Sequence, residues 1–549
     1  MPTRFLRPKR LLTLGVLAGA IALSVWWLGY IPYKPLAIYR PVPAAATFVG
    51  RHLALPARWG DLLANPLALA LMRTAGVDAE SAQALTADEA SQEWFNKLAG
   101  REGVLAYLPG RFNAPPAWMA VSHLGGDSQK LRWQLSLFKV PGFTRLTQFP
   151  GRAVWLVATP DLDPRQKLVI AFGEGVLMAC LSENPYAIAE VLGAYDGTVR
   201  RLMEAELSFK HFTESDDRSI PDRLWLRDDS AWAAEGAPGI LVDIPLLLSN
   251  AISLRASTAG LEQVPEFQGG ARDVADLARW LGAAPCAVAQ IQRSVLEALT
   301  GEPGLSRDVQ FAMQMLLDVA GDTVLAVFMD GELGGRLAWG AMRTLGLSGL
   351  RVPTVLLATP VATPSAAAEK IQQLLDISNA RYRGAFMLRP VGVDSTTIQV
   401  LESAGGNEWV DDLAPSDRPA YAVVEGWLLV SSNREALQKL LRGRAATTGS
   451  SAWTAAGGTA AAVAGWLDLA RSGKLARDAI ATWTMAQVFM GGGSSQAARE
   501  HLNEAKVWVD AFVPFGDAHW SLNRHAGQTT LTVDLGLSGA VNPVRIPAP

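Results

Sequence analysis

Residues 420–443, AYAVVEGWLLVSSNREALQKLLRG, form the stretch on which we base our prediction of the fold. Two short apolar runs meet at Glu425-Gly426, which is typical of a tight turn between two strands. After Asn433, apolar residues recur with helical spacing at Ala436, Leu437, Leu440 and Leu441. The stretch therefore predicts two antiparallel strands followed by a helix.

A second stretch of the same design lies upstream at residues 168–195, LVIAFGEGVLMACLSENPYAIAEVLGAY. Here Glu174-Gly175 occupies the turn, and Asn184 precedes the helical pattern. Three further pairs of segments match: AGREGVLAYLPG (99–110) with AGDTVLAVFMDG (320–331), PAWMAVSH (116–123) with PTVLLATP (353–360), and ILVDIPL (240–246) with GWLDLA (465–470). Because the four pairs keep their order along the chain, the sequence predicts a tandem duplication.

The N-terminal region contains an apolar run, Leu11–Tyr30, that carries no charge over its twenty residues. A helix of that length spans roughly 30 Å, the thickness of a bilayer core. Cations precede the run, and aromatic residues end it, so we predict a transmembrane anchor with a cytoplasmic N-terminus. The expected location is the inner (cytoplasmic) membrane, single-pass, with the bulk of the chain extracytoplasmic. A cleaved signal peptide with small residues around Ala18–Ala22 is one alternative, and a buried core helix is another.

The predicted fold class is α+β: an N-terminal transmembrane helix, two tandem, related α+β modules and a C-terminal β-meander. A chain of 549 residues is too long for a single hydrophobic core. Four prolines in residues 31–43 exclude a helix there and predict a stalk. The predicted ranges are 1–30 for the cytoplasmic stub and anchor, 31–43 for the stalk, 44–256 and 272–490 for the modules, and 499–549 for the meander and tail. Within the first module, residues 129–138 favour a helix, with a strand as the alternative.

Charge and cysteine content exclude several classes of function. The formal net charge is −3, and the first 34 residues carry five cations and no acid, so the remainder carries −3 − 5 = −8. A mildly acidic body offers no electrostatic surface for nucleic acid or for anionic lipid headgroups. Cys180 and Cys286 are too few for a disulfide framework or a cysteine-based zinc site. We predict two buried free thiols, with a single bridge between them as the alternative.

The anchor, the segment AVVEGWLLVSSNREALQKLL (422–441) and its earlier copy together carry a family resemblance. The chain resembles uncharacterised bacterial proteins that carry a domain of unknown function. The resemblance implies one N-terminal membrane anchor and a large, duplicated extracytoplasmic α+β body. It implies no catalytic residue.

No residue pattern leads us to assign a catalytic, cofactor-binding or metal-binding site. The six histidines lack the spacing of a zinc protease helix, and the chain contains no nucleophile elbow. The weaker patterns, each better explained by an ordinary structural role, are Ser136–Lys139, Arg471–Lys474, Gly331–Gly340, the pair His519 and His525, and His211 with Glu214, Asp216 and Asp217. Asp243 and Asp468 precede apolar segments at matched places in the two halves, so we predict that both cap helices.

We therefore expect a non-enzymatic, membrane-anchored binding or scaffold protein of the bacterial cell envelope. Its expected partners are the membrane, through the N-terminal helix, and other envelope proteins, with no nucleic acid and no cofactor. Two alternatives stay open: an envelope hydrolase with dispersed carboxylates, and a carrier of an apolar ligand or lipid. A lined cavity favours the carrier, two convergent carboxylates favour the hydrolase, and an exposed apolar patch favours the scaffold.

Overall fold

The computed structural model describes residues 16, 17, 19, 31–74, 77, 79–110, 115–158, 163–215, 217–227, 239–258, 281, 285–300, 307–329, 354–361, 363–381, 386–404, 410, 413–443, 461–489 and 495–536. The chain divides into two compact units. The first unit comprises residues 1–60, 80–245 and 544–549, and the second comprises residues 61–79 and 246–543.

The helices vary in length from short 3₁₀ turns to α18, with 21 residues. In chain order they are η1 (Pro35–Ile38), α2 (Leu55–Ala64), α3 (Pro66–Thr74), α4 (Ala79–Ala84), α5 (Glu89–Ala99), α6 (Asp127–Leu137), α7 (Ile188–Asp196), α8 (Leu202–Ala205), α9 (Leu207–Glu214), α11 (Arg293–Thr300), α12 (Arg307–Val319), α14 (Pro364–Arg381), α16 (Arg434–Gly443), α18 (Leu469–Phe489), α19 (Ser495–Phe512) and η2 (Val513–Phe515).

The strands of the first unit pair in the order β4-β5-β6-β7-β3-β2-β1-β8-β9, always antiparallel. Their bounds are β1 (Phe48–Leu53), β2 (Glu102–Leu108), β3 (Ala117–His123), β4 (Phe143–Arg145), β5 (Val154–Val157), β6 (Lys167–Phe172), β7 (Val176–Ser182), β8 (Asp222–Leu226) and β9 (Ile240–Leu248). Burial alternates residue by residue along β2, β3 and β7, as expected of strands with one face against the core.

The core of the first unit lies between the buried face of this sheet and the segments η1, α7, α8 and α9. Its members include Ile38, Tyr39, Ile188, Leu202 and Phe209, which are all essentially inaccessible to solvent. The prolines of residues 31–43 do prevent an α-helix there. However, this predicted stalk packs into the core, where Ala37, Ile38, Tyr39 and Val42 are buried.

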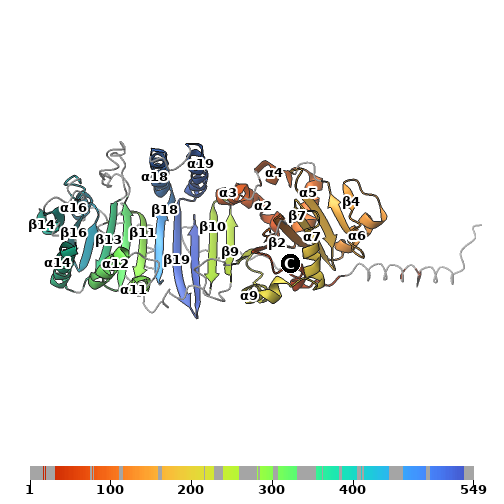
Figure 1. The fold of residues 1–549 in the computed structure, drawn as a ribbon, viewed down its shortest axis with the longest axis horizontal. Helices are drawn as coiled ribbons and strands as arrows, with labels where there is room; N and C mark the ends of the chain where they lie inside the picture. Colours follow the sequence, from red (N-terminus) through yellow and green to blue (C-terminus); the bar gives the residue numbers. More distant parts are fainter. Residues whose placement is uncertain are drawn as a thin grey trace, which may run out of the picture. The chain divides into compact units, whose positions relative to one another are not determined.

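The second unit repeats this order with every strand number raised by ten, β14-β15-β16-β17-β13-β12-β11-β18-β19, and β20 then pairs with β19. Figure 1 shows β13, β11, β18 and β19 in this order across the sheet. β10 then pairs antiparallel with β20. The bounds are β10 (Ala251–Thr258), β11 (Pro285–Gln292), β12 (Thr323–Met329), β13 (Thr354–Pro360), β14 (Phe386–Val393), β15 (Thr396–Ser403), β16 (Ala420–Val424), β17 (Trp427–Ser431), β18 (Val463–Asp468), β19 (Asp517–His525) and β20 (Gln528–Leu535).

Residues 168–195 and 420–443 have the same local structure. β6, β7 and α7 form strand, turn, strand and helix, as do β16, β17 and α16. Gly175 and Gly426 each have φ of +78°, a conformation that glycine adopts without steric cost. The segments 99–110 and 320–331 also contain equivalent strands, β2 and β12.

One of the proposed sequence matches is wrong. ILVDIPL lies in β9, whereas GWLDLA begins in β18, which has the position of β8 in the repeated strand order. The register identifies the true counterpart. Trp225 of β8 pairs with Val49 of β1, and Trp466 of β18 pairs with Val288 of β11. Both tryptophans are buried, so they occupy the same core position in the two units.

The predicted fold class therefore needs correction at the C-terminus. We expected a separate meander, but β19 and β20 lie between β18 and β10 within the second unit. β19 is the counterpart of β9, since β9 pairs with β8 as β19 pairs with β18. The sequence does not reveal that these strands join the larger sheet, because the hydrogen bonds that place them there are to residues far away in the chain.

The predicted single-pass anchor, and with it the inner-membrane location, is also corrected. Among the described residues, no helix is both long enough and apolar enough to cross a bilayer. The longest described helix, α18, carries four charged residues, Arg471, Lys474, Arg477 and Asp478. Of the predicted segment Leu11–Tyr30, only residues 16, 17 and 19 are described, and the rest lies outside the described residues.

Candidate functional site

A pocket of about 370 Å³ lies on the face of the first unit's sheet that is opposite the core. Its floor consists of β2, β3 and β7, with Leu105, Leu177 and Ala179 among the lining residues. Phe95 and Leu98 of α5 line its other side. α5 can cover the sheet in this way because these two residues recur with helical spacing and share one face. We call this the first pocket.

A second pocket, of about 340 Å³, lies in the second unit. Its lining includes Leu428 and Val430 of β17, which have the positions of Leu177 and Ala179 in the first unit. Leu316 and Val319 of α12, the helix that directly precedes β12, also line it, as α5 lines the first pocket. The two pockets therefore share one strand pair and one helix: β3 and β7 with α5 in the first unit, and β13 and β17 with α12 in the second. The second pocket is also lined by α14 and by β14, β15 and β16, whereas the first is also lined by β1 and β2.

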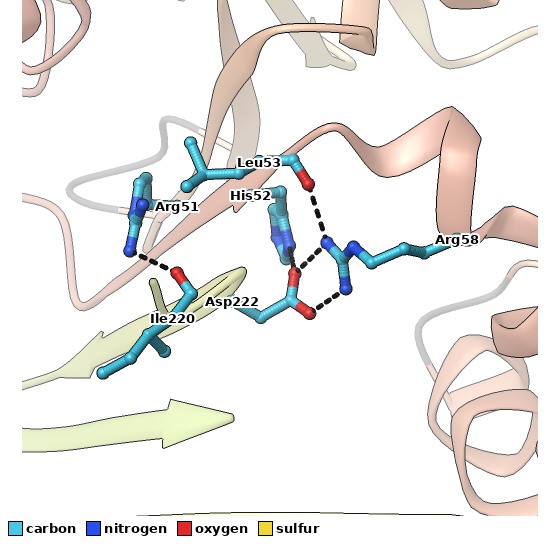
Figure 2. Close-up of polar contacts among 6 residues, drawn as sticks. All are labelled: Arg51, His52, Leu53, Arg58, Ile220 and Asp222. Atoms are coloured by element: carbon cyan, nitrogen blue, oxygen red, sulfur yellow. Dashed lines mark hydrogen bonds and ion pairs between the residues drawn. The ribbon is translucent and has the colours of Figure 1, made fainter. Parts of the chain in front are cut away.

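A polar cluster borders the first pocket at His52 of β1 (Figure 2). Nδ1 of His52 lies 2.7 Å from Oδ1 of Asp222 in β8. Arg58 of α2 contacts both carboxylate oxygens of Asp222, with Nη2 donating to Oδ1 at 2.9 Å, and it also donates to the carbonyl of Leu53. The cluster thus joins the start of α2 to the adjacent strands β1 and β8.

The electrostatics of the cluster keep Asp222 ionised. Burial by itself would raise the pKa of Asp222, which is only 4% exposed. The hydrogen bonds and charges of His52 and Arg58 outweigh burial and lower this pKa to about 2. An ionised carboxylate only accepts hydrogen bonds, so Nδ1 of His52 must carry a proton and donate to it. The ring is therefore held in one orientation at the border of the pocket.

Ser122 lies in the same cross-strand row as this cluster. Asp222, His52, Gly103 and Ser122 are successive partners across β8, β1, β2 and β3. The hydroxyl of Ser122 donates to the carbonyl of Leu98, at the end of α5. Its counterpart Thr359 similarly donates to the carbonyl of Thr323. The hydroxyl of Ser122 thus links β3 to the end of α5, and the hydroxyl of Thr359 links β13 to the start of β12. Both roles are structural.

The opposite face of the same strands holds a second set of charges. Arg51 of β1 pairs in register with Arg223 of β8, and both are almost fully buried. Nη2 of Arg51 donates to the carbonyl of Ile220 at 2.9 Å. Nε of Arg223 donates to Asp243 at 2.8 Å, and its Nη1 donates to the carbonyl of Ser215, just beyond α9. Both arginines thereby hold the segment that connects α9 to β8.

The second unit has replaced these charged residues. The register places Gln290 at the position of Arg51, Ala464 at that of Arg223, and Ile291 and Val463 at those of His52 and Asp222. Ile291 and Val463 pack in a small apolar cluster instead. Both units therefore have an apolar pocket, whereas the second-unit equivalents of Arg51, His52, Asp222 and Arg223 are uncharged.

The two aspartates predicted to cap helices have different roles. Asp468 does cap α18, since its Oδ1 accepts from the backbone N–H of Arg471 at 2.9 Å. Asp243 lies within β9 and forms the ion pair with Arg223 instead. They do not occupy matched positions, because β18 is the counterpart of β8. Neither contributes to the first or second pocket, and none of the residues that line these pockets is acidic.

The remaining sequence candidates are dispersed. Ser136 lies near the exposed end of α6, with Lys139 beyond it, and His519 lies 3.3 Å from Asp517 in β19. In the part of the chain that is described, no three His, Cys, Asp or Glu side chains are placed to hold a metal ion. Residues 331–340 and Asp216 lie outside the described residues. Both cysteines are buried free thiols, as predicted.

Sequence reasoning did not find His52, Arg58 and Asp222 as a group. His52 and Asp222 are 170 residues apart, and only the register of β1 against β8 brings them together. The residues that line the pockets were assigned to strands and helices, but the hollow between them has no sequence signature. A scan against models of protein families, a search of curated proteins and a search of solved structures each returned no match.

Proposed function

We propose that this protein is a non-enzymatic binding protein for apolar ligands, with one binding site in each unit. The observation that carries the proposal is that each unit has an apolar pocket, and that equivalent elements contribute to both: β3, β7 and α5 in the first unit, and β13, β17 and α12 in the second. Both volumes fall within the range of about 300–1,000 Å³ that is usual for small-molecule sites. A cavity of this kind favours the carrier of an apolar ligand or lipid among the functions that the sequence left open.

The lining residues support a ligand without charge over most of its length. Leucine, valine and alanine side chains line both pockets, and Phe95 also lines the first, so affinity would come from apolar surface removed from water. Each buried methylene contributes about 0.8 kcal/mol, which corresponds to about a fourfold gain in affinity. An alkyl chain is therefore the simplest ligand class, with affinity that increases with chain length until the pocket is filled.

The test is a titration of the full chain with an apolar fluorescent probe, followed by displacement with alkyl chains of increasing length. We expect saturable binding of two probes per chain and a gain of about fourfold for each added methylene. Ala120→Trp in β3 fills the first pocket, and Leu357→Trp at the equivalent position of β13 fills the second. Each should remove one of the two sites.

Gln528→Trp is the matched control, since Gln528 is exposed at the start of β20 and lines neither pocket. It should leave both sites intact. Binding that does not saturate, or that all three variants leave unchanged, would rule out the pockets as ligand sites. Circular dichroism of each variant should match that of the parent chain, which checks that the fold is retained.

A further inference from the structure

Three large apolar side chains project into solvent around the end of α6. Trp133, Leu137 and Phe138 are 45%, 76% and 67% exposed, respectively. Trp133 and Leu137 are one helical turn apart and therefore lie on the same face. The other face of α6 packs Leu131 and Leu135 against a small apolar cluster. We call Trp133, Leu137 and Phe138 the α6 patch.

The surroundings of the α6 patch are basic. Residues 127–146 contain four cations, Lys130, Arg132, Lys139 and Arg145, and one acid, Asp127, so the segment carries 4 − 1 = +3. All four cations are exposed, and Asp127 is paired with Lys130 at 2.7 Å. The whole chain has a net charge of −3. The segment that contains the patch is therefore positively charged, although the chain as a whole is negatively charged.

The equivalent helix of the second unit lacks the cluster of large exposed apolar side chains. α14 follows β13 as α6 follows β3, and among its described side chains Ile377 is the one large exposed apolar residue. The charge differs less: from the start of α14 to the end of β14, residues 364–393 carry four cations and two acids, so this segment sums to 4 − 2 = +2. The patch has no counterpart on the described side chains of this helix, so the repeated architecture does not require it.

We propose that the α6 patch docks the protein on a lipid surface that carries anionic headgroups. Tryptophan prefers the interfacial region of a bilayer, and exposed leucine and phenylalanine side chains gain by entering its apolar edge. The surrounding cations are attracted to the negative surface potential of such a layer, within a Debye length of it. An acidic protein surface would match the charges but not the isolated, outward-pointing apolar side chains. This inference is independent of the two ligand pockets.

The test places an environment-sensitive fluorophore on the full chain at Leu137→Cys. The two native cysteines are buried, and burial raises the pKa of Cys180 to about 12, so the introduced thiol is the one labelled. Vesicles of phosphatidylcholine with about one-third phosphatidylglycerol should shift the emission to shorter wavelength. Vesicles of phosphatidylcholine alone should produce a much smaller shift, because they lack the negative surface potential.

The matched control is the same fluorophore at Ile377→Cys in α14, which should show no shift with either vesicle. Adding Arg132→Glu and Lys139→Glu to the Leu137→Cys chain should abolish the shift with anionic vesicles. The proposal is overturned if position 137 shows no shift, or if position 377 shifts equally. It is also overturned if the double charge reversal leaves the shift unchanged. Because all labelled and reversed positions are exposed, these variants retain the fold.

Discussion

The buried carboxylate of Asp222 leads to the most specific prediction about stability. Replacing Asp222 with Asn removes the negative charge and keeps the shape of the side chain. The pKa of Asp222 is lowered from 3.8 to about 2, which corresponds to a stabilisation of about 2 kcal/mol when the carboxylate is ionised. Arg58 and His52 are 16% and 28% exposed, so water partly solvates them after the loss. We therefore expect a cost of about 2–3 kcal/mol near neutral pH.

The effect should depend on pH in a defined direction. Because the folded-state pKa is lowered, the stabilisation is present above the unfolded-state pKa and is lost as pH falls from about 4 to about 2. The difference in unfolding free energy between parent and variant should therefore shrink over that interval. Urea unfolding followed by circular dichroism, at several pH values between about 7 and about 3, measures this difference.

The control is Asp394→Asn, at an exposed turn residue whose φ of 50° asparagine adopts as readily as aspartate. It should change stability by less than about 0.5 kcal/mol at every pH. A cost for Asp222→Asn that is the same near pH 3 and near pH 7 would refute the reasoning. The carboxylate charge would then contribute nothing to the cluster.

Two further predictions use the same unfolding measurement. Asp468→Ala should lower the free energy of unfolding by about 1 kcal/mol, the usual cost of losing a helix cap. Asp243→Ala should lower it by about 3–5 kcal/mol, because it removes an ion partner of the buried Arg223. Equal costs for the two variants would contradict these roles. Gln290→Leu should stabilise the protein by about 1–3 kcal/mol, since the buried amide has no hydrogen-bond partner in the described part of the chain. A loss of stability would show that this amide is satisfied.

Local features of the fold were predictable from the sequence. The turn glycines Gly175 and Gly426, the alternating strands beside them and the helices after Asn184 and Asn433 depend on neighbouring residues. Their conformational preferences are therefore readable in one window of sequence. The helix expected over residues 129–138 is α6, within two residues at each end, for the same reason. The burial of both cysteines also followed from their apolar surroundings.

Other features depended on contacts between distant residues, and only the tertiary structure decided them. The assignment of β19 and β20 to the sheet, the match of Trp225 with Trp466 and the packing of residues 31–43 all depend on strand register or long-range burial. The candidate site also depends on distant contacts. Asp222 contacts His52 because β8 pairs with β1, and the pockets form where α5 covers one sheet and where α12 and α14 cover the other. Sequence periodicity specifies which face of an element is apolar, but not which distant element covers that face.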